Sequence, residues 1–225
     1  MKYLHFLLPF LFITTLQPSF AQDKENEKID ATIQVLKDFG TMKESIPHEL
    51  LQVSEGIIIV PGMINAGFVL GGKRGKGIAM VKNEDGSWSD PAFITLTGGS
   101  IGFQIGVQSV DLVLIFKHRT TLMNIGKGTF TLGGDISATA GPVGRSGSAS
   151  TDYKMEAEVY SYSKSKGLFA GISLNGSSIH VDDKANASFY GEATDASDIF
   201  EGEDSGDQQV TALKKELTKL YDEND

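Results

Sequence analysis

The N-terminal part of the chain contains a stripe of apolar residues with helical spacing. Its members are Ile29, Ile33, Val35, Leu36 and Phe39. Positions three or four residues apart lie on one face of a helix, so the stripe predicts an amphipathic helix over residues 23–39, which Gly40 ends. A second, shorter helix is expected from Ser45, an N-cap residue, with Pro47 in its first turn.

Beyond residue 56 the apolar positions come in short runs rich in β-branched residues, which is typical of strands. The expected strands are residues 57–61, 66–70, 77–82, 92–97, 101–107, 112–117, 135–140, 154–163, 168–174 and 177–181. Residues 71–76 and 83–86 are predicted to be turns, and the second contains the Asp-Gly pair that favours hairpins. Residues 120–125 are expected to form one helical turn.

Glycine is abundant, with 26 Gly in the chain, and most of them lie between residues 56 and 147. Gly inside strands marks bulges, bends or the close approach of another backbone. The sequence therefore predicts an α+β fold. Its centre is a strongly curved, mostly antiparallel sheet or a partly closed barrel, with helices from both termini packed on it.

The C-terminal part changes from acidic to amphipathic. Residues 192–207 contain acids and no Lys or Arg, which predicts a solvated linker or a frayed helix. The final helix is predicted from the apolar spacing of Val210, Leu213, Leu217 and Leu220. We expect one main domain over residues 22–200, followed by the acidic linker and C-terminal helix over residues 201–225.

The first 21 residues have the pattern of a secretory signal peptide. Lys2 precedes an apolar run over residues 4–16, and Ser19 and Ala21 have the spacing that a signal peptidase requires. Cleavage is expected after Ala21. The protein is therefore expected to be exported, to the periplasm or cell envelope of a bacterium. No Cys follows the apolar run, so a lipoprotein anchor is not expected.

Charge and cysteine content exclude several classes of function. The net charge is −9, so polyanions are repelled and nucleic acid is not expected as a partner. The chain has no Cys, which excludes thiol catalysis, iron–sulfur clusters and Cys-based zinc sites. His48, His118 and His180 show no metal-ligand spacing, and the acidic segment lacks the EF-hand pattern. No metal or cofactor is predicted.

One motif allows an enzymatic alternative. Residues 98–102 match the G-x-S-x-G pattern of a hydrolase, with Ser100 as the nucleophile. That chemistry requires Ser on a sharp strand-to-helix turn and a suitably placed His. Residues 102–107 are strand-like instead, so we predict that the protein is not an enzyme and keep a serine hydrolase as a remote alternative.

The predicted turn at residues 71–76 is the main candidate binding site. Lys73, Arg74 and Lys76 on a flexible tip could together hold one phosphate of a lipid or other anion. The segment is not a P-loop, because no Gly-Lys-Ser/Thr opens a helix there. Trp88, the only Trp of the chain, is a further candidate contact if it lies at the rim, although a place in the core is the ordinary alternative.

Several segments, taken together and in this order, resemble the SYLF domain family. They are Ile57 to Pro61, Ala66-Gly67-Phe68, Gly71-Gly72, Gly75, Gly77, Trp88 to Phe93, Gly98-Gly99-Ser100, Gly102, Gln104, Gly106, Asp111, Gly141-Pro142, Gly144-Arg145, Tyr160 to Ser163, Lys166 to Gly171, Asn186 and Phe189-Tyr190-Gly191. The resemblance covers about residues 30 to 200.

The resemblance implies a non-catalytic lipid-binding domain. Eukaryotic members bind phosphatidylinositol phosphates, and yeast members also bind actin. Residues 23–39 carry more acids than bases here, and actin is not expected as a partner in the compartment to which export would lead. We therefore expect a lipid or membrane surface as the partner. The alternative is a structural or protein-interaction module with a protein partner in the cell envelope.

Overall fold

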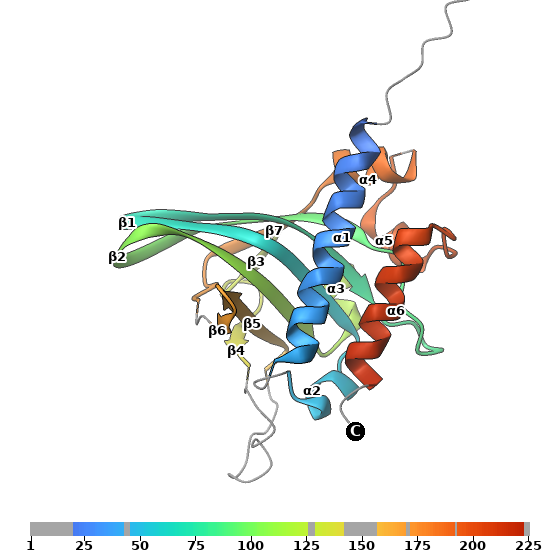
Figure 1. Ribbon diagram of the computed structural model, residues 1–225, viewed down its shortest axis with the longest axis horizontal. Coiled ribbons are helices and arrows are strands. Elements are labelled where there is room, and N and C mark those ends of the chain that lie inside the picture. The colour runs from blue at the N-terminus through green and yellow to red at the C-terminus, as the bar shows by residue number, and fades with distance from the viewer. Residues whose placement is uncertain are drawn as a thin grey trace, which may run out of the picture.

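The computed structural model describes residues 20–42, 46–125, 129–141, 157–169, 172–191 and 193–222 (Figure 1). In chain order the described elements are α1 (Phe20–Thr41), α2 (His48–Gln52), β1 (Gly56–Val81), β2 (Ala92–Phe116), α3 (Arg119–Ile125), β3 (Phe130–Leu132), β4 (Ala138–Ala140), β5 (Val159–Ser165), β6 (Leu168–Phe169), β7 (Ser177–Val181), α4 (Asp183–Tyr190), α5 (Ala196–Glu201) and α6 (Gln208–Asp222). The predicted signal peptide falls almost wholly outside these ranges and remains a prediction.

The two long strands β1 and β2 dominate the sheet. They pair antiparallel from Gly56↔Phe116 at one end to Ala79↔Ala92 at the other. The prediction of three shorter strands in each of these regions is therefore wrong. In particular, residues 71–76 are not a turn, because they pair with residues 95–100 of β2 inside a continuous ladder. Local sequence could not show this, since the pairing that extends the strand comes from residues far along the chain.

Glycine allows β1 to bend back on itself. A Cβ atom at Gly77 would overlap the carbonyl oxygen of Ile59, and one at Gly75 would lie 3.0 Å from the Cβ of Met63. The second half of β1 therefore lies directly against its first half. As a result, the middle of the β1–β2 pair projects as an arm from the rest of the molecule (Figure 1).

The remaining strands extend the sheet on both sides of β2. The order is β3-β7-β2-β5-β4, with β1 on β2 and β6 on β5. All pairs are antiparallel except β4–β5. The sheet is nearly closed into a barrel with flanking helices, which confirms the predicted α+β fold and its curvature.

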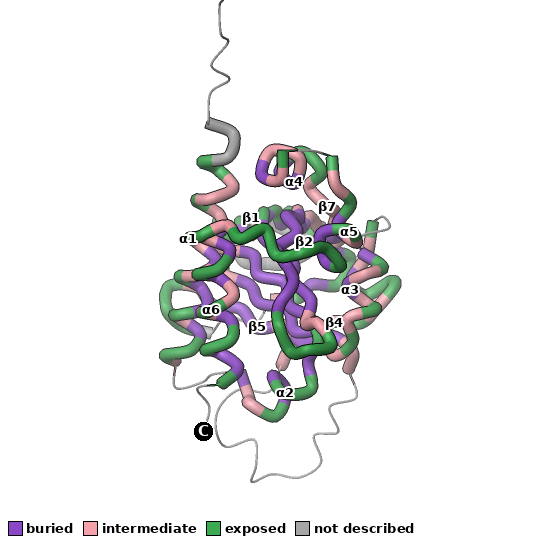
Figure 2. The backbone as a smooth tube through the Cα atoms, turned by 90° about the vertical axis from the view of Figure 1, so that its right-hand side faces the viewer, coloured by how far each residue is buried: buried purple, intermediate pink, exposed green. Residues whose placement is uncertain are grey.

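Two hydrophobic clusters lie on opposite faces of the β1–β2 pair. The first contains Ile57, Ile59, Ile78 and Met80 from β1, together with buried side chains of α1 and α6. We call this side the α1 face. The second contains Ile58 and Val60 from β1 and residues of α3, α5, β3 and β7. Figure 2 shows α1 and α6 side by side over buried strands.

The terminal helices agree with the sequence pattern. Residues 23–39 lie within α1, and Val210, Leu213, Leu217 and Leu220 are buried in α6. Because both helices belong to the first cluster, the C-terminal helix is part of the same hydrophobic core as α1. Among the helices in the described ranges, none combines the length and apolarity needed to cross a membrane.

Other boundaries differ from the predictions. The second helix, α2, begins at His48 after Pro47, and the expected cap Ser45 lies outside the described residues. Helix α4 was not predicted, because it is short and its apolar face consists of little more than Ala185 and Phe189. Of the strand expected at 135–140 only residues 138–140 form a strand, and β5 continues to Ser165, beyond the strand expected at 154–163. Residues 154–156 and 170–171 of the expected strands lie outside the described ranges, while β7 has the predicted bounds. The predicted helical turn at residues 120–125 corresponds to α3.

Candidate functional site

The three cations of the predicted binding turn are divided between the two faces of β1. Lys73 is buried at 6% exposure, whereas Arg74 and Lys76 are exposed. Alternate residues of a strand point to opposite faces. Arg74 and Lys76 therefore share the α1 face with Ile78. The three side chains therefore do not converge on one anion. The prediction that they lie on a flexible tip is wrong, because residues 71–76 pair with β2.

Lys73 is an interior residue. Its ammonium group donates a hydrogen bond to the backbone carbonyl of Ser173. Burial lowers the pKa of Lys73, because desolvation disfavours the charged form of an amine. In this position the side chain connects β1 to the segment before β7 and is not available to a surface ligand.

Arg74 and Lys76 lie beside a surface of hydroxyl and imidazole groups on the same face. The strand register aligns Arg74 with Thr97, and Thr97 with Ser178 of β7. It aligns Lys76 with Thr95, and Thr95 with His180. The surface, which we call the hydroxyl platform, comprises Arg74, Lys76, Thr95, Thr97, Thr129, Thr131, Ser178 and His180.

Hydrogen bonds connect the polar groups of the hydroxyl platform. His180 bonds the Thr97 hydroxyl through Nε2 at 3.4 Å and the Thr129 hydroxyl through Nδ1 at 3.1 Å. The Thr95 hydroxyl donates to Asp182 Oδ2 at 3.3 Å. These contacts link β2 and β7 to the loop before β3, so the platform is held on strands and not on a free loop.

An ion pair between Lys76 and Asp182 lies at one edge of the hydroxyl platform. The ammonium of Lys76 lies 2.7 Å from Asp182 Oδ2, and Asp182 also caps α4 by accepting from the Ala185 N–H. Partial burial opposes ionisation of Asp182, but the hydrogen bond and charge of Lys76 outweigh it and lower the pKa of this carboxyl. Burial, and then repulsion by Lys76, lowers the pKa of the nearby Lys28 of α1. Two lysines therefore meet at this edge.

Arg74 is the platform cation best placed to meet a ligand. It is exposed, and the described part of the chain gives it no ion-pair partner. A guanidinium group carries five donors in a planar fork that matches phosphate oxygens. With the hydroxyl groups of Thr97 and Ser178 in the same row, the surface is suited to an anionic oxygen ligand.

Trp88 lies in the core and not at the rim. It is 4% exposed and packs edge-on against Tyr221 of α6, with ring centroids 5.0 Å apart. The hydroxyl of Tyr221 in turn bonds Ser54 at 2.8 Å. In this structure Trp88 joins the β1–β2 loop to the C-terminal helix and offers little surface to a ligand.

The backbone around Ser100 does not form a nucleophile elbow. Residues 98–102 lie inside β2, and Ser100 pairs with Gly71 in the antiparallel ladder. The hydrolase motif requires a sharp turn from a strand into a helix. The chain continues as strand β2 on both sides of Ser100, up to Phe116. The sharp strand-to-helix turn that the hydrolase alternative requires is therefore absent at Ser100.

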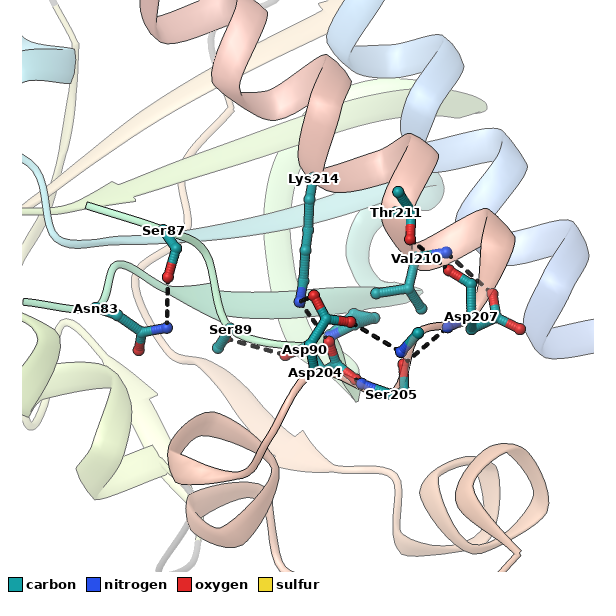
Figure 3. Close-up of polar contacts among 12 residues, drawn as sticks. Asn83, Ser87, Ser89, Asp90, Asp204, Ser205, Asp207, Val210, Thr211 and Lys214 are labelled. Atoms are coloured by element: carbon teal, nitrogen blue, oxygen red, sulfur yellow. Dashed lines mark hydrogen bonds and ion pairs between the residues drawn. The ribbon is translucent and has the colours of Figure 1, made fainter. Parts of the chain in front are cut away.

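The acidic segment expected to be a solvated linker is folded against the body. It contains α5, whose Ile199 and Phe200 are buried. Figure 3 shows Lys214 of α6 between Asp90 and Asp204, at 2.6 Å and 3.0 Å from their carboxylates. Asp90 Oδ2 also accepts from the Ser205 N–H at 2.9 Å. Within the described ranges, no cluster of His, Asp and Glu could hold a metal ion.

Several residues that carry the family resemblance have structural roles that sequence analysis missed. Asn186 is buried, and its amide oxygen accepts from the Phe93 N–H at 2.8 Å, which fixes α4 to β2. Asp111 accepts from the N–H of Gly62 at 2.8 Å, at a bulge where Gly62 has a φ of +56°. The segments around Gly144 and Arg145 lie outside the described residues.

Comparison with known proteins supports the resemblance. The family model Ysc84, described as "Las17-binding protein actin regulator", matches residues 97–220. The chain is 38% identical over 185 residues to LAS seventeen-binding protein 3 of Saccharomyces cerevisiae, covering 81% of this chain and 40% of the relative. It is 36% identical over 178 residues to SH3 domain-containing YSC84-like protein 1 of Homo sapiens, covering 79% of this chain and 51% of the relative.

The match thus spans about half or less of these curated relatives, and most of the chain described here. The family model itself covers β2 from residue 97, the platform strand β7, helices α3 to α5, and α6 up to residue 220. The resemblance seen in the sequence is therefore confirmed, and the chain belongs to the Ysc84 family, whose domain is also called SYLF.

Proposed function

We propose that this protein is an exported, non-catalytic lipid-binding protein, and that Arg74 and Lys76 contact a lipid headgroup phosphate from the hydroxyl platform. The observation that carries the proposal is the exposed Arg74 guanidinium in one row with two hydroxyl residues. A local cationic surface can attract a phosphate even when the whole chain has a net charge of −9. The backbone pairing of β1, β2 and β7 holds these residues in one row.

Two further observations support a binding role. The Ser100 segment lacks the geometry of a hydrolase nucleophile, and the family model and the yeast relative are named for binding to another protein. The expected export separates this chain from the partner in those names. A lipid surface is available in every envelope compartment, which makes it the partner most compatible with the predicted signal peptide.

The test is sedimentation with vesicles of phosphatidylcholine containing phosphatidylglycerol, using the protein in its natural, processed form. We expect saturable binding by the wild type, weakened at least about tenfold in Arg74→Ala/Lys76→Gln, since a single charged hydrogen bond contributes about 1.5–3 kcal/mol. The matched control, Lys37→Ala/Lys215→Gln, removes two exposed lysines on α1 and α6. Equal weakening of both variants would show a bulk charge effect and would rule out a site at the platform.

The alternative is a protein-interaction module of the envelope, as the names of the relatives suggest. It predicts that the wild type does not bind these vesicles. It also predicts that crosslinking gives one reproducible protein partner. Saturable vesicle binding that depends on Arg74 would exclude this alternative as the main function.

A further inference from the structure

The middle of the β1–β2 pair forms a two-stranded arm with which no further strand pairs among the described residues, and only Met63 at its base is buried in the second cluster. We define the β-arm as residues 62–72 of β1 and 99–109 of β2, which pair with each other. β7 pairs with β2 only up to residue 98, and β5 pairs with it only from residue 111. Figure 1 shows the arm extending away from α1, α6 and the rest of the sheet.

The β-arm contains no charged residue. Between residues 61 and 72, and between residues 92 and 110, the sequence has no Asp, Glu, Lys or Arg, although 22% of the whole chain is charged. Alternate positions along both strands are apolar, namely Ile64, Ala66, Phe68 and Leu70 on β1 and Ile101, Phe103, Ile105 and Val107 on β2. An ordinary solvated hairpin would carry charges, so this composition indicates an apolar partner.

Exposed large apolar side chains gather at the β-arm. In the described part of the chain four are exposed, Val53 at 51%, Ile64 at 46%, Val107 at 72% and Leu168 at 73%. Ile64 pairs with Ser109 and Ala66 with Val107, so Ile64 and Val107 are diagonal neighbours on one face. The Ser165 hydroxyl donates to the Ser109 carbonyl at 3.0 Å, which brings the β5–β6 hairpin and its Leu168 to the arm.

We infer that the β-arm, with Leu168 beside it, inserts shallowly into the acyl region of a lipid bilayer. This inference rests on the proposed lipid-binding function and assigns its apolar contact surface. Insertion of uncharged strands avoids the cost of placing a charge in hydrocarbon. Both strands of the arm have an edge without a described partner strand, and unpaired backbone groups are costly in hydrocarbon, so the arm lies at the interface and does not cross the bilayer.

Cations next to the uncharged region support a lipid partner over a second copy of the chain. Arg74 follows the uncharged part of β1 two residues after Gly72, and the exposed Lys166 lies in the β5–β6 hairpin. Basic side chains bordering an apolar surface can reach headgroup phosphates while the apolar part contacts the acyl chains. A self-associating face would have no need of this border.

The test compares two identical substitutions at different places. Val107→Asn changes the β-arm, and Val53→Asn changes an exposed Val at the end of α2, before β1 begins and outside the arm; neither alters the charge. Their binding to phosphatidylcholine vesicles, with and without phosphatidylglycerol, is measured by sedimentation with the natural, processed protein. We expect Val107→Asn to bind about tenfold more weakly than the wild type and Val53→Asn to bind equally. Thermal melting followed by circular dichroism checks that both variants are folded.

A second measurement keeps the inference testable if Val107→Asn misfolds. In Val107→Trp and Val53→Trp, fluorescence is measured with vesicles of brominated lipids, which quench a Trp at the depth of the bromine. We expect quenching at position 107 and none beyond the Trp88 background at position 53.

The outcomes separate the two proposals. If the wild type binds and Val107→Asn binds equally, the β-arm inference is overturned while the lipid-binding function stands. If the wild type binds neither vesicle, both are overturned. If Val107→Asn converts a dimer to a monomer without changing vesicle binding, the arm is a self-association surface and the inference is overturned.

Discussion

Lys73 and Arg74 are neighbours in the chain but lie on opposite faces of β1. The alternation of a strand places one ammonium in the interior, bonded to the Ser173 carbonyl, and leaves one guanidinium exposed on the hydroxyl platform. The sequence identifies this cluster as basic, but it cannot assign faces while the segment is taken for a turn. The face on which each side chain lies decides which of the two cations can contact a ligand.

Replacing Lys73 should therefore not affect lipid binding. In Lys73→Met the buried charge is replaced by an apolar chain of similar length, so the desolvation that lowers the pKa of Lys73 is removed. We expect the free energy of unfolding to be unchanged or raised by about 1 kcal/mol, and vesicle binding to equal that of the wild type. Denaturant unfolding and sedimentation check this. Lost binding with intact stability would show that Lys73 reaches the ligand after all.

Asp38 gives a pH-dependent prediction. Its hydrogen bond from Lys164, which connects α1 to β5, lowers the pKa of the Asp38 carboxyl. A carboxyl with a lowered pKa stabilises the folded state above its ordinary pKa of about 3.9, and this contribution is lost as the pH falls through the folded value. Asp38→Asn should lose less stability than the wild type between about pH 5 and 2, measured by urea unfolding. The exposed Glu49→Gln is the control, and an unchanged pH profile for Asp38→Asn would contradict the prediction.

At the scale of the elements, β1 shows what local patterns can and cannot predict. The apolar stripes of α1 and α6 and the run of β7 are local signals, and all three elements formed where they were expected. The bend of β1 depends on contact between Gly77 and the Ile59 backbone, which no window of sequence contains. Helix α4 had signals that could have been used, since Asp182 caps its start and Gly191 ends it with a φ of +81°.

The close approach at Gly77 can be tested with a single methyl group. Gly77→Ala would force the two halves of β1 apart, and we expect a loss of about 3 kcal/mol, or about 6–12 °C in melting temperature. Gly99→Ala is the matched control, because a Cβ there meets no atom within 4 Å. Equal melting temperatures for the two variants would mean that β1 does not bend back in this way.

At the scale of the whole molecule, the two ends of the chain complete one core. α6 packs beside α1, and its Tyr221 and Lys214 contact Trp88 and Asp90 of the β1–β2 connection. The acidic composition of residues 192–207 predicted solvent exposure, but it could not show that Asp90, Asp204 and Lys214 meet. These three residues come from segments far apart in the chain, so their ion pairs depend on the tertiary fold. The ion pairs and the buried side chains of α5 hold residues 192–207 against the body.

Lys214 should consequently contribute more to stability than its neighbour Lys215. Lys214→Ala leaves the buried Asp90 carboxylate without its cation, and we expect a loss of about 3 kcal/mol. Lys215→Ala changes an exposed residue of the same helix and should cost less than about 0.5 kcal/mol. Chemical unfolding measures both. Equal effects would contradict the role of the ion pair, whereas partial recovery in Asp90→Asn/Lys214→Met would support it.

Hydrogen–deuterium exchange of the wild-type protein with and without phosphatidylglycerol-containing vesicles tests lipid binding and its location together. We expect slower exchange on vesicles in the β-arm, residues 62–72 and 99–109, and in β1 around Arg74 and Lys76, with α6 unchanged. The same exchange everywhere with and without vesicles, or protection confined to the helices, would contradict lipid binding through the β-arm and the hydroxyl platform.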